Sequence, residues 1–549
     1  MSSLTKKRST ARDRANEARA DRDSRPRGPK TRRGVELLLT CMALIISVGA
    51  YALVGIGTEG TVPANVSYYG GWLILLAVLL HIAVRWKAKY ADPVIVPIAI
   101  MLNGIGIAMI FRIDIAKERF GFEATAAKQL IWMTLGIAVA IGIVMFLRDH
   151  RMLRRYTFTS GLAAIVFLLL PLIPGLGKTI NGARIWIGVG PLSFQPGEIA
   201  KILLAIFFAG YLVSYRDTLS LAGPKFLGLQ LPRARDMGPI MIAWLASVGV
   251  LVFQRDLGTS LLFFGLFVAM LYVATERKSW IIIGLLLFAG GAVLASQLFT
   301  HVGQRIDGWL NALDPEQYNK EFGGSYQLVQ GLFGMAHGGL TGTGLGLGRP
   351  DIVPFADSDF IIPSLGEELG LVGLFAILML YVVFVERGLR IALGVRDGFG
   401  KLLAAGICFT IGLQCFIVVG GVTRLIPLTG LTTPFLAAGG SSLLANWIIV
   451  GLLLRISDNA RRPAAEFETG VLRVIPDEER RAAANLEDDT ALNDGDTDPR
   501  RREEFSDAEL AGYQHKAARS QGGRTQGVAR PNRRGGSSDD LPTSGGERP

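Results

Sequence analysis

Charged side chains beside chain-breaking residues are the part of this sequence best suited to chemistry. A Pro-Gly pair breaks the chain just before a predicted helix whose first turn contains Glu198, and Lys201 follows on the same face. The helix dipole favours a carboxylate there, and a spacing of three residues lets the two side chains pair. Gln195 precedes the break, and Arg184 and Trp186 form an amphipathic pair suited to a membrane interface. A capped helix end with one ion pair is the alternative interpretation.

A second candidate, Asp256, lies in a short polar segment between two apolar runs, with Thr259 three residues later. Aspartate suits a helix N-cap here, which contributes on the order of 1 kcal/mol. A carboxylate at membrane depth is also a functional candidate, because burying an ionisable group there is costly. The sequence leaves both interpretations open.

Asp357 and Asp359 form an Asp-x-Asp sequence where a long polar loop leads back into apolar residues. Asp359 precedes Phe360, and partial desolvation of its carboxylate predicts a raised pKa, which suits a general base. This spacing could also hold a divalent cation, Mg²⁺ or Mn²⁺, with Glu198 and Asp256 as further candidate ligands. Ordinary loop acids are the alternative.

Two segments rich in glycine accompany these acids. Residues 338–348 superficially resemble a dinucleotide-binding loop, but no strand precedes them, so that function is excluded. Their backbone could instead approach an anionic ligand closely. Residues 420–442 form a loop of small and helix-breaking residues that contains Arg424 and could dip into a cavity. A tight turn with small-residue helix packing is the alternative.

The elements that must position these residues are membrane helices. Half of the 549 residues are apolar, and the apolar runs repeatedly reach the length that crosses a bilayer, about 20 residues. This pattern excludes a soluble multidomain protein and predicts an all-α polytopic membrane protein, because helices satisfy their own backbone in lipid. Twelve spans are predicted, at 35–56, 68–86, 93–111, 129–147, 156–173, 198–213, 239–254, 257–275, 280–298, 361–385, 402–422 and 434–456.

Charge is concentrated in two tails. Residues 1–33 hold 12 Lys or Arg and 4 Asp or Glu, and residues 457–549 hold 15 and 19. Both tails are too polar to fold alone, so we predict them to be disordered. The net charge of +11 does not indicate nucleic-acid binding, because the basic residues lie in the first tail and in short loops. The three cysteines are predicted to be packing residues, since they lie in apolar segments without metal-ligand spacing.

The distribution of basic residues predicts the orientation. With the first tail in the cytoplasm, the inner loops hold 17 Lys or Arg and the outer loops hold 11. Twelve spans then place both termini inside and the large loop 300–360 outside. The loop 112–128 is an exception, because it carries four basic residues on the outer side, Arg112, Lys117, Arg119 and Lys128.

All four candidate clusters fall on the outer side of this topology, and this agreement counts for more than any one of them. They could line one cavity that opens to the outer leaflet and is floored by hydrophobic helices. Such a cavity would suit an amphipathic, lipid-linked substrate with an anionic head.

Five segments, which follow each other in the same order as the family's motifs, resemble the SEDS family (shape, elongation, division and sporulation). This family comprises the FtsW, RodA and SpoVE membrane proteins of bacterial wall synthesis. The resemblance covers about residues 93–456. Gly197 and Arg255 stand where the family usually has Ser and Pro, but none of the charged motif residues that the resemblance assigns to this chain is replaced. The segments lie at 182–201, 254–259, 338–346, 358–373 and 427–442.

The resemblance implies a division of the chain. The core of ten helices would occupy 93–456, and two extra N-terminal helices at 34–92 are similar to those of the actinobacterial RodA branch. The tails 1–33 and 457–549 would flank this membrane part. Asp359 falls on the essential aspartate of the family, and Glu198, Lys201 and Asp256 fall on its other charged motif positions.

The implied activity is that of a peptidoglycan glycosyltransferase, which polymerises lipid II into glycan strands at the outer face of the cytoplasmic membrane. Lys201, with Arg184, Arg424 or a divalent cation, would neutralise the pyrophosphate of the leaving group. The implied partner is a class B penicillin-binding protein, the transpeptidase that cross-links the strands. A role in elongation and cell shape is favoured over an FtsW-like role in division.

Two other classes of protein remain as alternatives. A flippase for the lipid-linked precursor would use the same outer cavity, but it should also need polar groups in the inner half of the spans. Few are evident there, namely His81 and Gln414. A scaffold that only recruits a transpeptidase would not need buried charges.

Overall fold

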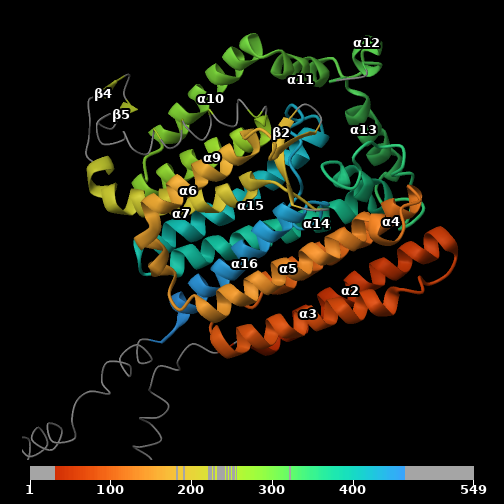
Figure 1. The fold of residues 1–549 in the computed structure, drawn as a ribbon, viewed down its shortest axis with the longest axis horizontal. Helices are drawn as coiled ribbons and strands as arrows, with labels where there is room; N and C mark the ends of the chain where they lie inside the picture. The colour runs from red at the N-terminus through yellow and green to blue at the C-terminus, as the bar shows by residue number, and fades with distance from the viewer. Residues whose placement is uncertain are drawn as a thin grey trace, which may run out of the picture. The chain divides into compact units, whose positions relative to one another are not determined.

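The structure is a computed structural model, and it describes residues 33–180, 183–189, 192–220, 256–320 and 323–463, with isolated positions and two short strands between 225 and 254. The described residues belong to one compact unit that ends at Pro463. Long helices lie side by side in this unit and account for most of it (Figure 1).

Eleven helical segments of the described chain are long and apolar enough to cross a membrane. They confirm eleven of the predicted spans, and the twelfth, 239–254, lies almost wholly outside the described residues. The segment His150–Leu172 combines α6 with two short 3₁₀ helices, η2 (His150–Tyr156) and η3 (Leu170–Leu172). The spanning helices are α2 (Arg33–Glu59), α3 (Val66–Lys87), α4 (Ile95–Ala116), α5 (Thr125–Phe146), α6 (Thr157–Leu169), α7 (Pro196–Ser220), α9 (Leu257–Thr275), α10 (Ser279–Leu298), α14 (Ile361–Gly394), α15 (Gly398–Val422) and α16 (Gly440–Arg461).

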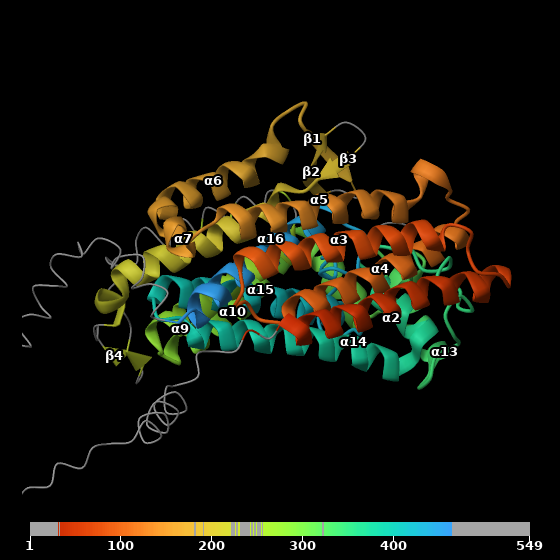
Figure 2. The same ribbon diagram turned by 90° about the horizontal axis from the view of Figure 1, so that it is seen from below.

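The helices α4 and α16 are the most buried spans, and α10 is almost wholly exposed. In Figure 1, α16 lies among the other helices, whereas α2 and α3 pack side by side at one margin, and Figure 2 shows α2 and α3 in front of the other helices. Trp447 of α16 is fully buried, and its indole nitrogen donates to Asn103 of α4 over 3.3 Å. Gly136 of α5 leaves room for the same ring, because a Cβ there would lie 2.8 Å from it. Small residues and a satisfied polar contact therefore hold the centre together.

Short elements lie between the spans. A three-stranded antiparallel sheet, with order β1-β2-β3, precedes α7, and the strands β4 and β5 form a separate two-stranded ribbon. The sequence analysis did not predict these strands. The loop 300–360 contains three helices (Figure 1). The elements are β1 (Gly177–Ile180), β2 (Ala183–Val189), β3 (Leu192–Phe194), β4 (Lys225–Phe226), β5 (Leu229–Gln230), η1 (Gly121–Glu123), α11 (Thr300–Leu310), α12 (Pro315–Tyr318) and α13 (Tyr326–Gly338).

The glycine-rich segment 338–348 packs on the first turns of α14. The Glu368 carboxylate accepts hydrogen bonds from the Gly346 backbone (2.8 Å) and from the Arg112 guanidinium (2.9 Å). Gly370 interrupts α14 with a φ of 68° and a ψ of −175°, a conformation open essentially only to glycine. This break lets the loop and the helix exchange backbone hydrogen bonds, since the Leu371 amide donates to the Gly339 carbonyl over 3.0 Å. The glycines serve close packing of the backbone.

We expect Gly370→Ala to destabilise the protein. The added Cβ would lie 2.3 Å from the Gly342 amide nitrogen, and alanine disfavours the positive φ. The cost should be about 1–3 kcal/mol. Thermal unfolding of the purified protein in detergent measures it as a lower Tm. Gly142→Ala is the matched control, because a Cβ added to that helical glycine of α5 would have nothing within 4 Å. Equal Tm values for the two variants would contradict the prediction.

Candidate active site

The first turns of α7 place a buried ion pair inside the bundle. Proline suits the first position of a helix, and α7 begins at Pro196. The Glu198 and Lys201 side chains then pair over 2.5 Å, and both are buried. The Lys201 ammonium also donates to Gln414 of α15 over 3.1 Å. The Gln414 amide in turn donates to the Thr432 carbonyl over 2.9 Å. The first candidate cluster is thus connected to the 420–442 loop.

Asp256 caps α9, and it also interacts electrostatically with Arg305 and Glu198. Its carboxylate accepts a hydrogen bond from the Thr259 amide over 2.9 Å, as the N-cap interpretation predicts. Burial raises the pKa of Asp256, while the bonds from Thr259 and the positive charge of Arg305 act in the opposite direction. The charge of Glu198 raises this pKa further, so the first two candidate clusters share one electrostatic environment.

Arg305 of α11 connects the remaining clusters, and the sequence analysis did not identify it. Its guanidinium donates to the carbonyls of Leu428 (3.1 Å) and Thr429 (3.0 Å). Burial lowers the pKa of Arg305, and the negative charges of Asp256 and Asp359 oppose that shift. The only signal in the sequence was a lone basic residue near the beginning of the acidic loop 300–360.

Asp359 lies in a series of turns directly before α14. The Ser358 hydroxyl donates to its carboxylate over 3.1 Å, and Arg305 provides a nearby positive charge. Burial raises the pKa of Asp359 to about 6, and the negative charge of Asp357 adds to the increase. A carboxylate with this pKa is ionised at neutral pH yet accepts a proton more readily than an exposed aspartate. The raised pKa predicted from the sequence is confirmed.

Asp357 has its own partners. Its carboxylate accepts from Arg119 (3.1 Å) and Thr125 (3.4 Å), and its carbonyl accepts from the Ala438 amide (2.7 Å). Within the part of the chain that the structure describes, no three His, Cys, Asp or Glu side chains gather as a possible metal site. The described carboxylates therefore do not by themselves make a divalent-cation site, and the cation stays a prediction.

The candidates near the small sheet lie at the margin of this network. Arg184 in β2 donates through its guanidinium to the Ile173 carbonyl (3.2 Å) and through its amide to the Gln254 carbonyl (3.3 Å). Trp186 pairs with Lys178 of β1 across the sheet and is partly exposed. Gln195 is buried, and its carbonyl accepts from the Glu198 amide over 3.2 Å.

Arg424 holds the helix that carries Arg305. Its guanidinium donates to the carbonyls of Trp309 (2.8 Å) and Leu310 (2.6 Å), and the Trp309 indole donates back to the Arg424 carbonyl over 3.0 Å. Three hydrogen bonds thus join the 420–442 loop to the C-terminal end of α11. In this structure Arg424 acts on the site by positioning α11.

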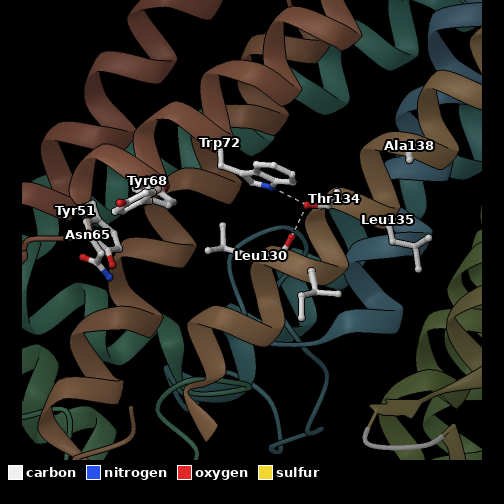
Figure 3. Close-up of a pocket in the computed structure, with 10 residues that line it drawn as sticks. Tyr51, Asn65, Tyr68, Trp72, Leu130, Thr134, Leu135 and Ala138 are labelled. Carbon is white, nitrogen blue, oxygen red and sulfur yellow. Dashed lines mark hydrogen bonds between the residues drawn. The ribbon is translucent and has the colours of Figure 1, made fainter. Parts of the chain in front are cut away.

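A separate open cavity of about 740 Å³ lies between α2, α3 and α5 (Figure 3). The Trp72 indole donates to the Thr134 hydroxyl across it over 2.9 Å. The charged candidates are not among its lining residues, so it is distinct from the network around Asp359. The residues that line it are Tyr51, Asn65, Tyr68, Tyr69, Trp72, Leu130, Ile131, Thr134, Leu135 and Ala138.

The fold and the site define a multi-pass membrane protein with a network of charged residues near one end of its helical bundle. Residues 93–462 match the family model of the cell cycle proteins FtsW, RodA and SpoVE. The chain belongs to this family.

Similar proteins include two mycobacterial relatives, both named peptidoglycan glycosyltransferase RodA. The relative from Mycobacterium tuberculosis is 50% identical over 79% of this chain and 92% of its own length. The relative from Mycobacterium leprae is 48% identical with the same coverage. Among solved structures, one from a study of a peptidoglycan synthase complex that coordinates polymerization and crosslinking matches with a TM-score of 0.54 and 25% identity. The match covers 68% of this chain and 99% of that one.

We expect Lys201→Met to destabilise the protein, because it leaves the Glu198 carboxylate buried without its cation. Breaking a buried pair costs about 3–5 kcal/mol. The double variant Glu198→Gln/Lys201→Met should recover much of that loss, since no unpaired charge remains. Tm in detergent measures all three proteins. The exposed pair Arg349–Asp351 is the control, and Arg349→Gln should leave Tm unchanged. A double variant no more stable than Lys201→Met would contradict this account.

Proposed function

We propose that the chain is a RodA-like peptidoglycan glycosyltransferase that polymerises lipid II through base catalysis by Asp359. The observation that carries the proposal is the Asp359 carboxylate, whose pKa burial raises to about 6, near the partly buried cation Arg305. The relatives named above support the activity. The role in elongation and cell shape is the one that the resemblance to the RodA branch implies, and an FtsW-like role in division is the alternative.

In the proposed step, Asp359 accepts the proton of the 4-hydroxyl of the acceptor GlcNAc. That oxygen attacks the anomeric carbon of the donor MurNAc with inversion, and undecaprenyl pyrophosphate leaves. Arg305 stabilises the ionised form of Asp359 before the transfer. Lys201 and Arg305 are the described cations best placed to stabilise the charge that develops on the pyrophosphate, since both belong to the network around Asp256 and Asp359.

A divalent cation, Mg²⁺ or Mn²⁺, has no step in this mechanism. Asp357 is paired with Arg119, Glu198 is paired with Lys201, and Asp256 is engaged by Thr259. The ligands of such a cation would therefore have to come from Asp359, water or the substrate pyrophosphate.

The proposed location is the cytoplasmic membrane, with both termini inside and the site on the outer side. The excess of basic residues in the predicted inner loops supports this orientation. The proposed partner is a class B penicillin-binding protein. It is supported by the similar solved structure from the peptidoglycan synthase complex, in which polymerization and crosslinking are coordinated.

The lipid-flippase alternative requires a polar path through the inner half of the bundle. Buried ionic groups do occur towards that end, but they are engaged with each other and with helix ends. Glu36 pairs with Arg33 and lies 3.3 Å from His81, and Asp458 pairs with Arg462. These contacts support a structural role for the inner charges, which favours chemistry at the opposite surface over transport.

Asp359→Asn should fold, insert and lose polymerisation, because the amide cannot accept the acceptor proton. We expect a loss of at least 100-fold, within the range that general base catalysis contributes. Purified wild type and variant are incubated with lipid II, with and without a cognate class B partner, and glycan length is resolved on a gel. Equal polymer from both proteins would remove Asp359 from the chemistry. No polymer from either protein, even with the partner, would favour lipid transport.

The rate should depend on pH through the Asp359 carboxylate. Because burial raises its pKa to about 6, the group is ionised at neutral pH and becomes protonated as the pH falls. The rate should therefore be nearly constant above pH 7 and decrease about tenfold per pH unit well below 6. Initial rates with lipid II between pH 5 and 8 measure this limb. A flat profile down to pH 5 would contradict base catalysis by this residue.

A further inference from the structure

Two of the four basic residues in 112–128, the outer segment that departs from the charge rule, pair with specific acids. Arg112 donates to the Glu368 carboxylate over 2.9 Å. Arg119 donates to the Asp357 carboxylate over 3.1 Å and to the Thr125 hydroxyl over 3.1 Å. Arg119 thus contacts the residue two positions before Asp359. The loop carries these charges where they meet acids of the Asp359 segment and of α14.

The loop around Arg119 has a defined shape. The Arg119 amide donates to the Asp114 carbonyl over 2.9 Å, and the Ala126 amide donates to the Asp114 carboxylate over 2.7 Å. Asp114 is buried, so it ties the two ends of the loop to the bundle. Glu118 adopts a φ of 53°, a conformation that costs energy in a residue with a side chain. This folded loop presents the Arg119 guanidinium to Asp357.

The Asp359 segment, by contrast, has little regular structure of its own. Residues 351–360 form consecutive turns. Within them the Ser358 and Phe360 amides both donate to the Phe355 carbonyl, over 3.0 and 3.2 Å. Hydrogen bonds tie these turns to distant parts of the chain at Pro354, whose carbonyl accepts from the Gln327 side chain over 3.1 Å, and at Asp357, which has three such partners. Arg119 and Thr125 hold its side chain, and Ala438 holds its carbonyl.

We propose that Arg119 is a positioning residue, which holds Asp357 and through it keeps the Asp359 carboxylate oriented for proton transfer. The inference rests on the proposed role of Asp359. The Arg119 side chain is 39% exposed, so it can be replaced without leaving a large cavity. Its partner Asp357 is a charge on the same turn as Asp359, so the pair sets the position and the electrostatic environment of the base together.

The charges that face Asp359 predict opposite effects for the two members of the pair. Arg305 lowers the pKa of Asp359 from α11, and Asp357 raises it from the same turn. Arg119 pairs with Asp357 and lies 4.0 Å from Asp114. Removing Arg119 exposes Asp359 to the full charge of Asp357, which raises the pKa of Asp359. Removing the charge of Asp357 lowers it.

The test compares Arg119→Gln, Asp357→Asn and the double variant in the lipid II polymerisation assay. Each single change should reduce kcat by roughly tenfold with little change in KM, because a small misplacement of a catalytic group is costly. The double variant should lose no more than the worse single variant, since both changes remove one interaction. Arg119→Lys, which keeps the charge, should retain most of the activity.

The pH profile provides the readout that a structural role alone would not change. The acid limb should move to higher pH in Arg119→Gln and to lower pH in Asp357→Asn, each by roughly half a pH unit. Lys117→Gln is the matched control, because this cation two residues away has no ion pair or side-chain hydrogen bond among the described residues. It should match wild type in rate and profile.

The outcomes separate this inference from the function on which it rests. Wild-type rates in Arg119→Gln, losses that multiply in the double variant, or an unshifted acid limb in both single variants would overturn the positioning role. Full activity in Asp359→Asn would instead overturn the proposed base. A raised KM with an unchanged kcat in Arg119→Gln would also overturn the inference, because it would make Arg119 a substrate contact.

Discussion

The structure depends on one constraint, which is that a charge inside an apolar helical bundle must have a partner. Moving an ion out of water costs several kcal/mol, and only good geometry with further hydrogen bonds compensates for it. Lys201 satisfies this requirement with Glu198 and Gln414, and Arg112 does so with Glu368. The Glu198–Lys201 pair lies within α7, whereas the contact of Lys201 with Gln414 joins α7 to α15, and the contact of Arg112 with Glu368 joins α4 to α14. The network that makes the site possible therefore also determines how the surrounding segments pack.

Arg305 shows how this constraint leads to function. Its two carbonyl partners in the 420–442 loop hold the guanidinium in place, while Asp256 and Asp359 supply the negative charge that it needs. Burial raises the pKa of Asp359, while the hydrogen bonds from the Ser358 hydroxyl and the backbone, together with the positive charge of Arg305, limit that pKa to about 6. Without burial the carboxylate would be a weaker base, and without the opposing hydrogen bonds and positive charge it would hold its proton to a higher pH. The fold thus brings burial and the opposing groups together at one residue.

The spans and the charged motif residues could be predicted from the sequence because their signals are local. A hydrophobic run identifies a membrane helix by itself, and Glu198 and Lys201 lie within one helical turn of each other. Arg305 and Arg119 could not be recognised in this way. The acids that they face lie 54 and 238 residues further along the chain, at Asp359 and Asp357, so only the tertiary fold shows the pairing. The three-stranded sheet was missed because its strands of three to seven residues give too weak a pattern against the apolar helices around them.

The loop 112–128 shows how such pairings modify a rule based on counting charges. The positive-inside rule counts each basic residue as if it were free in a loop. Arg112 is instead buried against Glu368, and Arg119 faces Asp357 and Asp114. Their charges are largely compensated within the folded protein, so they do not oppose an orientation that places this loop on the same side as Asp359. An exception to a topological rule is therefore a useful signal, because it marks basic residues whose presence is explained by acids elsewhere in the fold.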